Sequence, residues 1–195
     1  MKKKLLVLPA MAAMILLLAG LVQGAGFIKF DGIEGESTTR HEGEIDILSF
    51  SWGMSQSGTM QTARGGGAGK VSVNDLVFTK YVGKSSPVLM EAVASGRHIP
   101  TVVLEIERGP GGEERFPYLK YELKNVLVTS YSVGWNSSQA DSVPTEEMSL
   151  NFEEIKVTYV EQEPDGSRGG VFSFFWNFLK SVGGSEEESE DPVLV

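Results

Sequence analysis

Apolar residues that recur at every second position dominate the middle of this chain and restrict what it can fold into. Val102, Leu104 and Ile106 alternate with a set that includes Thr101, Glu105 and Glu107, and the stretch from Met148 to Phe152 follows the same rule. A period of two is typical of β-strands that have one buried and one solvated face. The pattern predicts a domain built mainly from strands, at residues 26–31, 44–55, 70–80, 101–108, 115–132 and 146–160.

The alternation changes phase within the last of these strands. Up to Phe152 the apolar residues have even numbers, whereas after Glu153-Glu154 they are Ile155 and Val157. A single extra residue is the mark of a β-bulge, which bends a strand as the closure of a barrel requires. We therefore expect a bulge at Glu153-Glu154.

One segment carries the signals of a helix. Ser86 can act as its cap, Pro87 suits its first position, apolar residues fill 88–94, and Gly96 can end it. Many strands and one short helix predict an antiparallel barrel or two-sheet sandwich with the helix against its flank.

Residues 54–70 show no alternation and end in a run of glycines. This segment is expected to form a long loop, and long loops in compact domains are usually functional. Gly69-Lys70 resembles the end of a phosphate-binding loop, but Arg64 stands where the first glycine belongs and Val71 where Ser or Thr should follow. A flexible or assembly-forming loop is the better interpretation.

The two ends of the chain differ from the middle. Three lysines followed by the uncharged, apolar residues 5–22 predict a secretory signal at 1–24, with an uncleaved anchor as the alternative. Residues 171–178 fit a last strand over the barrel, or else an amphipathic helix that binds a membrane or a partner. Five acidic residues between 186 and 191 predict a disordered tail at 183–195. The folded domain is then expected at 25–182.

Composition excludes several classes of function. The formal net charge is −9, and this acidic balance argues against nucleic acid as a partner. The chain has no cysteine and only two histidines, His41 and His98, both in polar stretches that indicate surface positions. Neither has a nucleophile beside it. We therefore predict no enzyme activity, no catalytic residue, no metal site and no cofactor.

Several ungapped blocks of the sequence, taken in order, form one long pattern. They are residues 27–30, 35–37, 44–58, 65–71, 75–81, 86–90, 95–98, 123–128 and 149–152. Together they resemble the haemolysin-coregulated protein (Hcp) family, the tube proteins of bacterial type VI secretion, and the likeness extends over residues 27–170.

The resemblance implies an antiparallel barrel of two sheets with a flanking helix. It also implies six-membered rings that stack into a tube, carry effectors in the lumen, and work with spike and sheath proteins. By the same resemblance a ring-stacking loop is expected, with its contacts at Met54, Gly58, Arg64, Gly65, Gly66, Gly67, Gly69 and Lys70.

A lumen wall that lets cargo pass should be polar and carry small side chains. Leu48, Phe50 and Trp52 share one face of the second expected strand, which we assign to the core. Ser49 and Ser51 share the opposite face, and we expect them to approach the lumen and contact effectors.

The predicted signal departs from the resemblance, because tubes of this family are built in the cytoplasm. Either the protein is secreted to the periplasm or beyond after cleavage, or Met1 is not the true start and the chain is cytoplasmic before export. The alternative function is an exported Hcp-like ring or binding protein of the cell envelope that works without a contractile machine. Membrane contact is expected only through the N-terminal segment, if it is not cleaved.

Overall fold

The computed structural model describes residues 24–38, 40–58, 68–107, 116–135, 143–164 and 166–188. Residues 1–23 of the expected signal lie outside this part of the chain. Within it, no helix is long and apolar enough to cross a membrane. The elements are β1 Ala25–Phe30, β2 Ile45–Ile47, β3 Ser49–Ser51, β4 Met54–Gly58, β5 Ala68–Val73, β6 Leu76–Tyr81, α2 Ser86–Ser95, β7 His98–Glu107, β8 Pro117–Gly134, β9 Thr145–Gln162, β10 Arg168–Asn177 and β11 Val182–Glu188.

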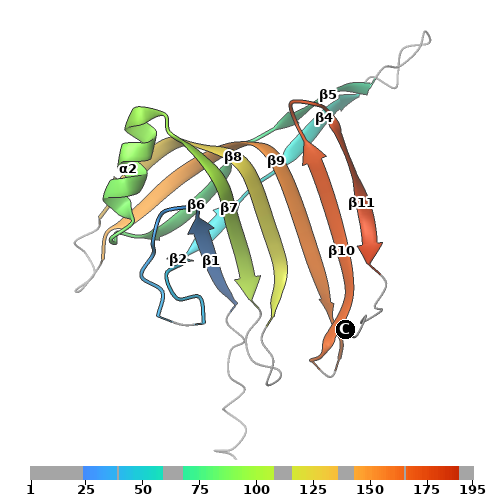
Figure 1. Cartoon of the computed structure of the whole chain (residues 1–195), viewed down its shortest axis with the longest axis horizontal. Helices are drawn as coiled ribbons and strands as arrows, with labels where there is room; N and C mark the ends of the chain where they lie inside the picture. The colour runs from blue at the N-terminus through green and yellow to red at the C-terminus, as the bar shows by residue number, and fades with distance from the viewer. Residues whose placement is uncertain are drawn as a thin grey trace, which may run out of the picture.

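Within the described residues, the mainly β fold with one short helix is confirmed, and the strand pairings are antiparallel. The strand order β11-β10-β9-β8-β7-β1-β2 continues through β3, which pairs with β6, and β6 returns to β9. The strands from β9 through β1 to β2, and from β3 through β6 back to β9, form a circuit that the chain itself joins at Leu48, between β2 and β3. β10 and β11 extend the sheet beyond β9 (Figure 1). Inside the circuit lies an apolar core that includes Ile28, Phe78, Leu104 and Leu150, all nearly inaccessible to solvent.

The circuit closes at residues 45–51. Ile45–Ile47 pairs with β1, whereas Ser49–Ser51 pairs with β6, so the chain changes partner at Leu48. Phe50 packs against the core as predicted, but Leu48 is 49% exposed, so its assignment to the core face is wrong. The change of partner breaks the alternation that a single strand from 44 to 55 would have kept.

The predicted irregularity at Glu153-Glu154 is present as a change in the burial phase of β9, from Phe152 to Ile155. The pairing register with β8 does not shift there, since the recorded shift lies between Val128 and Ser130, so the location of the bulge is corrected. Opposite the phase change, Asn125 has a φ of 51° and donates a hydrogen bond to the Glu153 carboxylate. Bonds from Asn125 and Asn177 hold the pKa of Glu153 below its ordinary value.

The helix α2 lies against one flank of the barrel, with Leu89 and Ala92 buried beneath it (Figure 1). It ends at Gly96, whose φ of 65° is left-handed, as the sequence predicts. The assignment of Ser86 as the cap is wrong: Ser85 occupies that position, without a side-chain capping bond.

Ser86 instead belongs to a buried polar cluster between the helix and the sheet. Lys80 Nζ lies 2.6 Å from Glu146 Oε2, and both side chains are almost completely buried. The Ser86 hydroxyl donates to the same oxygen at 2.8 Å, and the Tyr131 hydroxyl donates to Glu146 Oε1 at 2.8 Å. Burial, together with this bond, raises the pKa of Tyr131. Every member is paired, so the cluster is a structural joint.

The C-terminal region is a strand hairpin. Residues 171–177 belong to β10, which confirms the strand interpretation over the helical one. The prediction of disorder is wrong for residues 183–188, because they belong to β11, which pairs with β10. The remainder of the tail lies outside the described residues.

Candidate functional site

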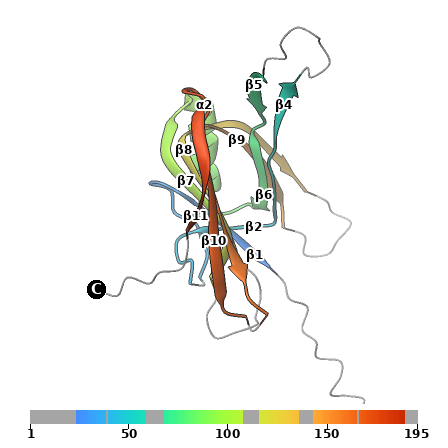
Figure 2. The ribbon, with the colours of Figure 1, turned by 90° about the vertical axis from the view of Figure 1, so that its right-hand side faces the viewer.

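The two ends of the glycine-rich segment are strands that pair with each other as a hairpin, apart from the main sheet. β4 and β5 form their own two-stranded sheet, in which Met54 pairs with Val73 and Gly58 with Ala68. Figures 1 and 2 show this hairpin extending away from the barrel. The expected loop is therefore shorter than residues 54–70, because strands occupy both of its ends.

The predicted stacking contacts are divided by this geometry. Met54, Gly58, Gly69 and Lys70 lie in the two strands, and Met54 is 48% exposed. Arg64, Gly65, Gly66 and Gly67 lie outside the described residues.

A hollow separates the base of the hairpin from the C-terminal strands. Its volume is about 400 Å³, and its lining includes Met54 and Val71 on one side and Phe174 and Trp176 on the other. Phe174 and Trp176 also pack against the core with parallel rings. The base of the hairpin therefore faces an aromatic surface across this hollow.

Ser49 and Ser51 lie on an exposed polar face that crosses four strands. The sheet pairing places Ser51, Val77, Ser149 and Ser130 in one row across β3, β6, β9 and β8. The adjacent row on the same face consists of Ser49, Thr79, Glu147 and Ser132.

Hydrogen bonds join these small side chains along the face. The hydroxyls of Ser49 and Thr79 are 2.7 Å apart, and Ser130 donates to Ser149 at 2.8 Å. The row between the two polar rows points inward instead, where Phe78 and Met148 are buried. We refer to the two outward rows as the polar face.

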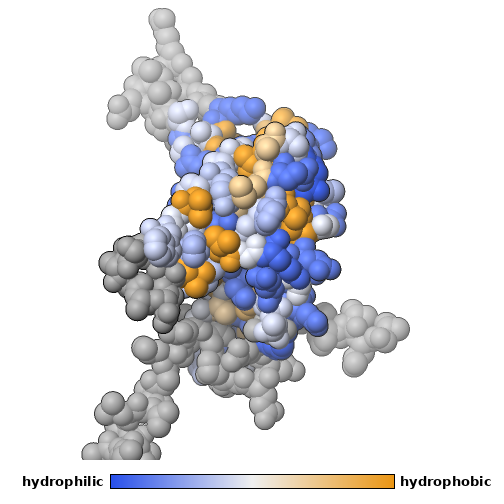
Figure 3. Space-filling model, turned by 90° about the vertical axis from the view of Figure 1, so that its left-hand side faces the viewer, coloured by the Kyte–Doolittle hydropathy of each residue, from blue (hydrophilic) through white to orange (hydrophobic). Residues whose placement is uncertain are grey.

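The surface around α2 has a different character. Figure 3 shows apolar side chains there, scattered among hydrophilic ones. On the helix itself Val88 and Met90 are 38% and 46% exposed. No single residue type dominates this side.

The two histidines differ, and one of them contradicts its prediction. His98 is exposed and its Nδ1 lies 2.7 Å from Asn125 Oδ1, which agrees with a surface position. The His41 side chain is only 10% exposed, and its ring stacks on Phe27 with centroids 3.8 Å apart. The surface assignment of His41 is therefore wrong.

His41 is buried by acidic neighbours. Its Nδ1 lies 2.9 Å from Glu44 Oε2, and its Nε2 lies 3.1 Å from Glu107 Oε1. Burial acts to lower the pKa of His41, but the bonds to Glu107 and Glu44 outweigh it, so this pKa lies above its ordinary value. The sequence did not predict this cluster, because Glu105 and Glu107 lie far from His41 along the chain. They come close to it only when β7 pairs with β1.

The sequence and fold match one known family. The family model described as "Type VI secretion system effector, Hcp" covers residues 27–159. The chain belongs to the Hcp family of type VI secretion, whose members are secreted proteins of this machinery.

Relatives support this assignment along most of the chain. "Protein hcp1" of Pseudomonas aeruginosa is 48% identical over 158 residues, which are 80% of this chain and 96% of the relative. A solved structure of a type six secretion system protein superposes with a TM-score of 0.77 at 29% identity, and it covers 83% of this chain and 100% of that one. Hcp1 from Salmonella typhimurium gives a TM-score of 0.65 at 30% identity over 84% and 99% of the two chains.

Proposed function

We propose that this protein is a structural tube subunit of type VI secretion, which forms six-membered rings that stack and carry effectors in the lumen. It acts without catalysis or cofactor. Membership of the Hcp family supports a place in type VI secretion, and the polar face supports the role as a tube subunit. That face is the observation that carries the proposal, because six of its eight residues are Ser or Thr, where an ordinary sheet surface would carry more long charged side chains.

The polar face is suited to line a passage. Ser49, Ser51 and Ser149 project little beyond the backbone, so a ring that turned this face inward would keep its lumen wide. The hydroxyls of Ser49 and Ser149 already form hydrogen bonds with Thr79 and Ser130, so they demand no specific partner, and such a wall can accept different cargo proteins. We assign Ser49 and Ser51 to effector contact on this basis.

The projecting hairpin is suited to stacking. A ring built head-to-tail needs different surfaces for its lateral and axial contacts. The hairpin formed by β4 and β5 stands clear of the circuit of strands, so it can reach another ring without disturbing the fold. We assign the axial contact to residues 54–70, including the tip beyond the described residues.

Light scattering on residues 25–195, with negative-stain images of the same peak, tests the ring. The expected result is a mass of six chains and annular particles. A strict monomer at all concentrations would contradict the proposal and would favour an exported Hcp-like binding protein that works without a contractile machine.

The proposed partners are further copies of the chain, the spike and sheath proteins, and effectors. We propose that the protein leaves the producing cell as part of the tube. Cleavage after residue 24 predicts that mature protein from the periplasm begins at Ala25, and terminal sequencing of protein from each compartment tests the route.

A further inference from the structure

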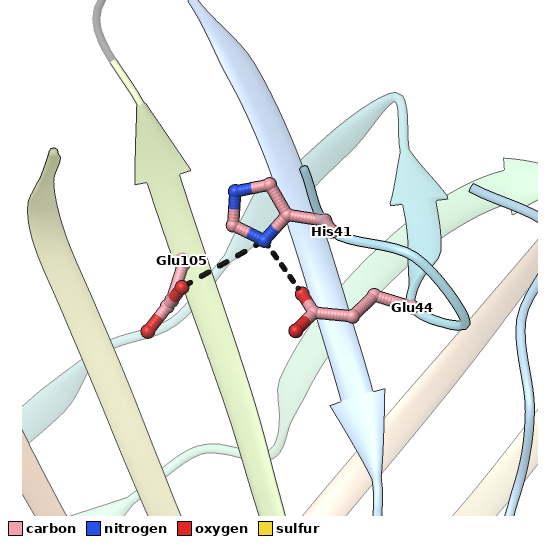
Figure 4. Close-up of side chains that lie close together, drawn as sticks. All are labelled: His41, Glu44 and Glu105. Atoms are coloured by element: carbon pink, nitrogen blue, oxygen red, sulfur yellow. Dashed lines mark hydrogen bonds and ion pairs between the residues drawn. The ribbon is translucent and has the colours of Figure 1, made fainter. Parts of the chain in front are cut away.

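Four side chains converge where β7 reaches its end. His41 and Glu44 come from the connection between β1 and β2, whereas Glu105 comes from β7 (Figure 4). Glu107, the last residue of β7, contacts His41 Nε2. The four side chains are between 8% and 18% exposed, which is low for groups of this charge. Carboxylates are rarely buried this far unless cations or hydrogen bonds compensate them.

Three of these groups offer ligand atoms around one point. His41 Nδ1 lies 2.9 Å from Glu44 Oε2 and 3.9 Å from Glu105 Oε2, and the three atoms all fall within 4.8 Å of one another. Zinc bonds of about 2.0–2.2 Å in a tetrahedral shell place neighbouring ligand atoms roughly 3.3 Å apart. The two separations lie on either side of this value, so small side-chain rotations would complete the shell.

The outer contacts orient each ligand toward that point. Glu107 Oε1 lies against the opposite ring nitrogen, His41 Nε2, and Arg40 in turn contacts Glu107 at 3.2 Å. A ligating histidine commonly donates its second N–H to a carboxylate in this way, and the metal binds the other ring nitrogen. In His41 that nitrogen is Nδ1, so the ion would take the place of the proton that Nδ1 shares with Glu44 Oε2.

Outer contacts also orient the two carboxylates that would bind the ion. Lys29 and Lys120 contact the Oε1 atoms of Glu44 and Glu105, at 3.9 and 3.4 Å respectively. Both Oε2 atoms face His41 Nδ1. The stacked ring of Phe27 fixes the plane of the imidazole, with an angle of 12° between the rings.

We propose that this cluster is a divalent transition-metal site, best suited to Zn²⁺. Its ligands are His41 Nδ1, Glu44 Oε2 and Glu105 Oε2, with water in the fourth position and Glu107 as the outer partner of His41. Two carboxylates balance the charge of the ion, and the mixed imidazole and carboxylate donors suit zinc better than magnesium or calcium. The ion clamps the connection between β1 and β2 onto β7, and it therefore stabilises the folded chain.

Titration calorimetry with zinc chloride on the EDTA-treated protein at neutral pH is the test, with native mass spectrometry for stoichiometry. The expected result is one ion per chain and a higher Tm with zinc. Glu107→Gln should weaken binding by about 10- to 100-fold, because it removes the outer partner while all three ligands stay in place. His41→Gln should lose the site.

His98→Gln is the matched control, since it removes the other histidine of the chain and should bind zinc like the wild type. If His41→Gln fails to fold by circular dichroism, Glu105→Gln carries the test, because it keeps both hydrogen bonds of His41. A folded wild-type protein that binds no zinc would overturn the proposal and leave a proton shared between His41 and Glu44. Equal zinc binding by wild type and His41→Gln would also overturn it, by placing the ion elsewhere.

Discussion

The barrel body and the projecting hairpin are both built from antiparallel strands, but they differ in how many neighbours support each strand. In the body, most strands pair with neighbours on both sides, as β1, β6, β7, β8 and β9 do, and even buried charges such as Lys80 and Glu146 are paired. The hairpin has only its own two strands, and a hollow separates its base from Phe174 and Trp176. A two-stranded ribbon gains little stability by itself. The difference indicates that the body determines whether the chain folds, whereas the hairpin determines what the folded chain assembles with.

The largest effect on stability is expected in the body, at Lys80. Lys80→Met leaves the Glu146 carboxylate buried without its cation, and the free energy of unfolding should fall by about 3–5 kcal/mol. Lys84→Met is the control, because Lys84 forms an exposed pair with Glu34 that should contribute about 0–1 kcal/mol. Urea unfolding of the three proteins measures both changes, and equal losses from the two variants would contradict the assignment of Lys80 as part of a structural joint.

A smaller loss is expected at the end of α2. Gly96 has a left-handed φ of 65°, so Gly96→Ala should destabilise the chain by about 1–2 kcal/mol. An added methyl group at Gly134 meets no atom within 4 Å and no unusual φ, so Gly134→Ala serves as the control. Thermal unfolding should separate the two alanine variants, and an unchanged Tm for Gly96→Ala would count against the strain argument.

Almost no loss of stability is expected on the polar face. Ser51→Gln should leave Tm and ring formation unchanged but weaken retention of an effector, because the longer side chain enters the lumen. Co-purification of an effector with the rings measures this. Ser95→Gln, on the exposed end of α2, is a matched control that should retain cargo normally. Unchanged retention by Ser51→Gln would remove the lumen assignment.

Much of the body could be predicted from the sequence, because a period of two records which face of each strand is buried. The prediction that Leu48 faces the core failed, because the chain changes its pairing partner there and the alternation does not indicate which strand lies beside it. The prediction of disorder for the acidic residues of β11 failed for another reason: composition indicated solvation, whereas the backbone of β10 offered an edge to pair with. The His41 cluster depends on the pairing of β1 with β7, which no local pattern encodes.

The assignment of the hairpin to ring stacking depends on its place in the sequence and on the resemblance to the Hcp family, and both were available from the sequence alone. What the structure adds is the separation of the hairpin from the main sheet. Because β4 and β5 form their own sheet, we expect that residues between them can be removed without damage to the fold, which allows a direct test.

The most direct test of this division of roles is deletion of residues 64–69, followed by negative-stain imaging and thermal unfolding beside the wild type. The account predicts an unchanged Tm and intact six-membered rings that no longer stack into tubes. Tubes of wild-type length, or a deletion variant that fails to fold, would contradict it.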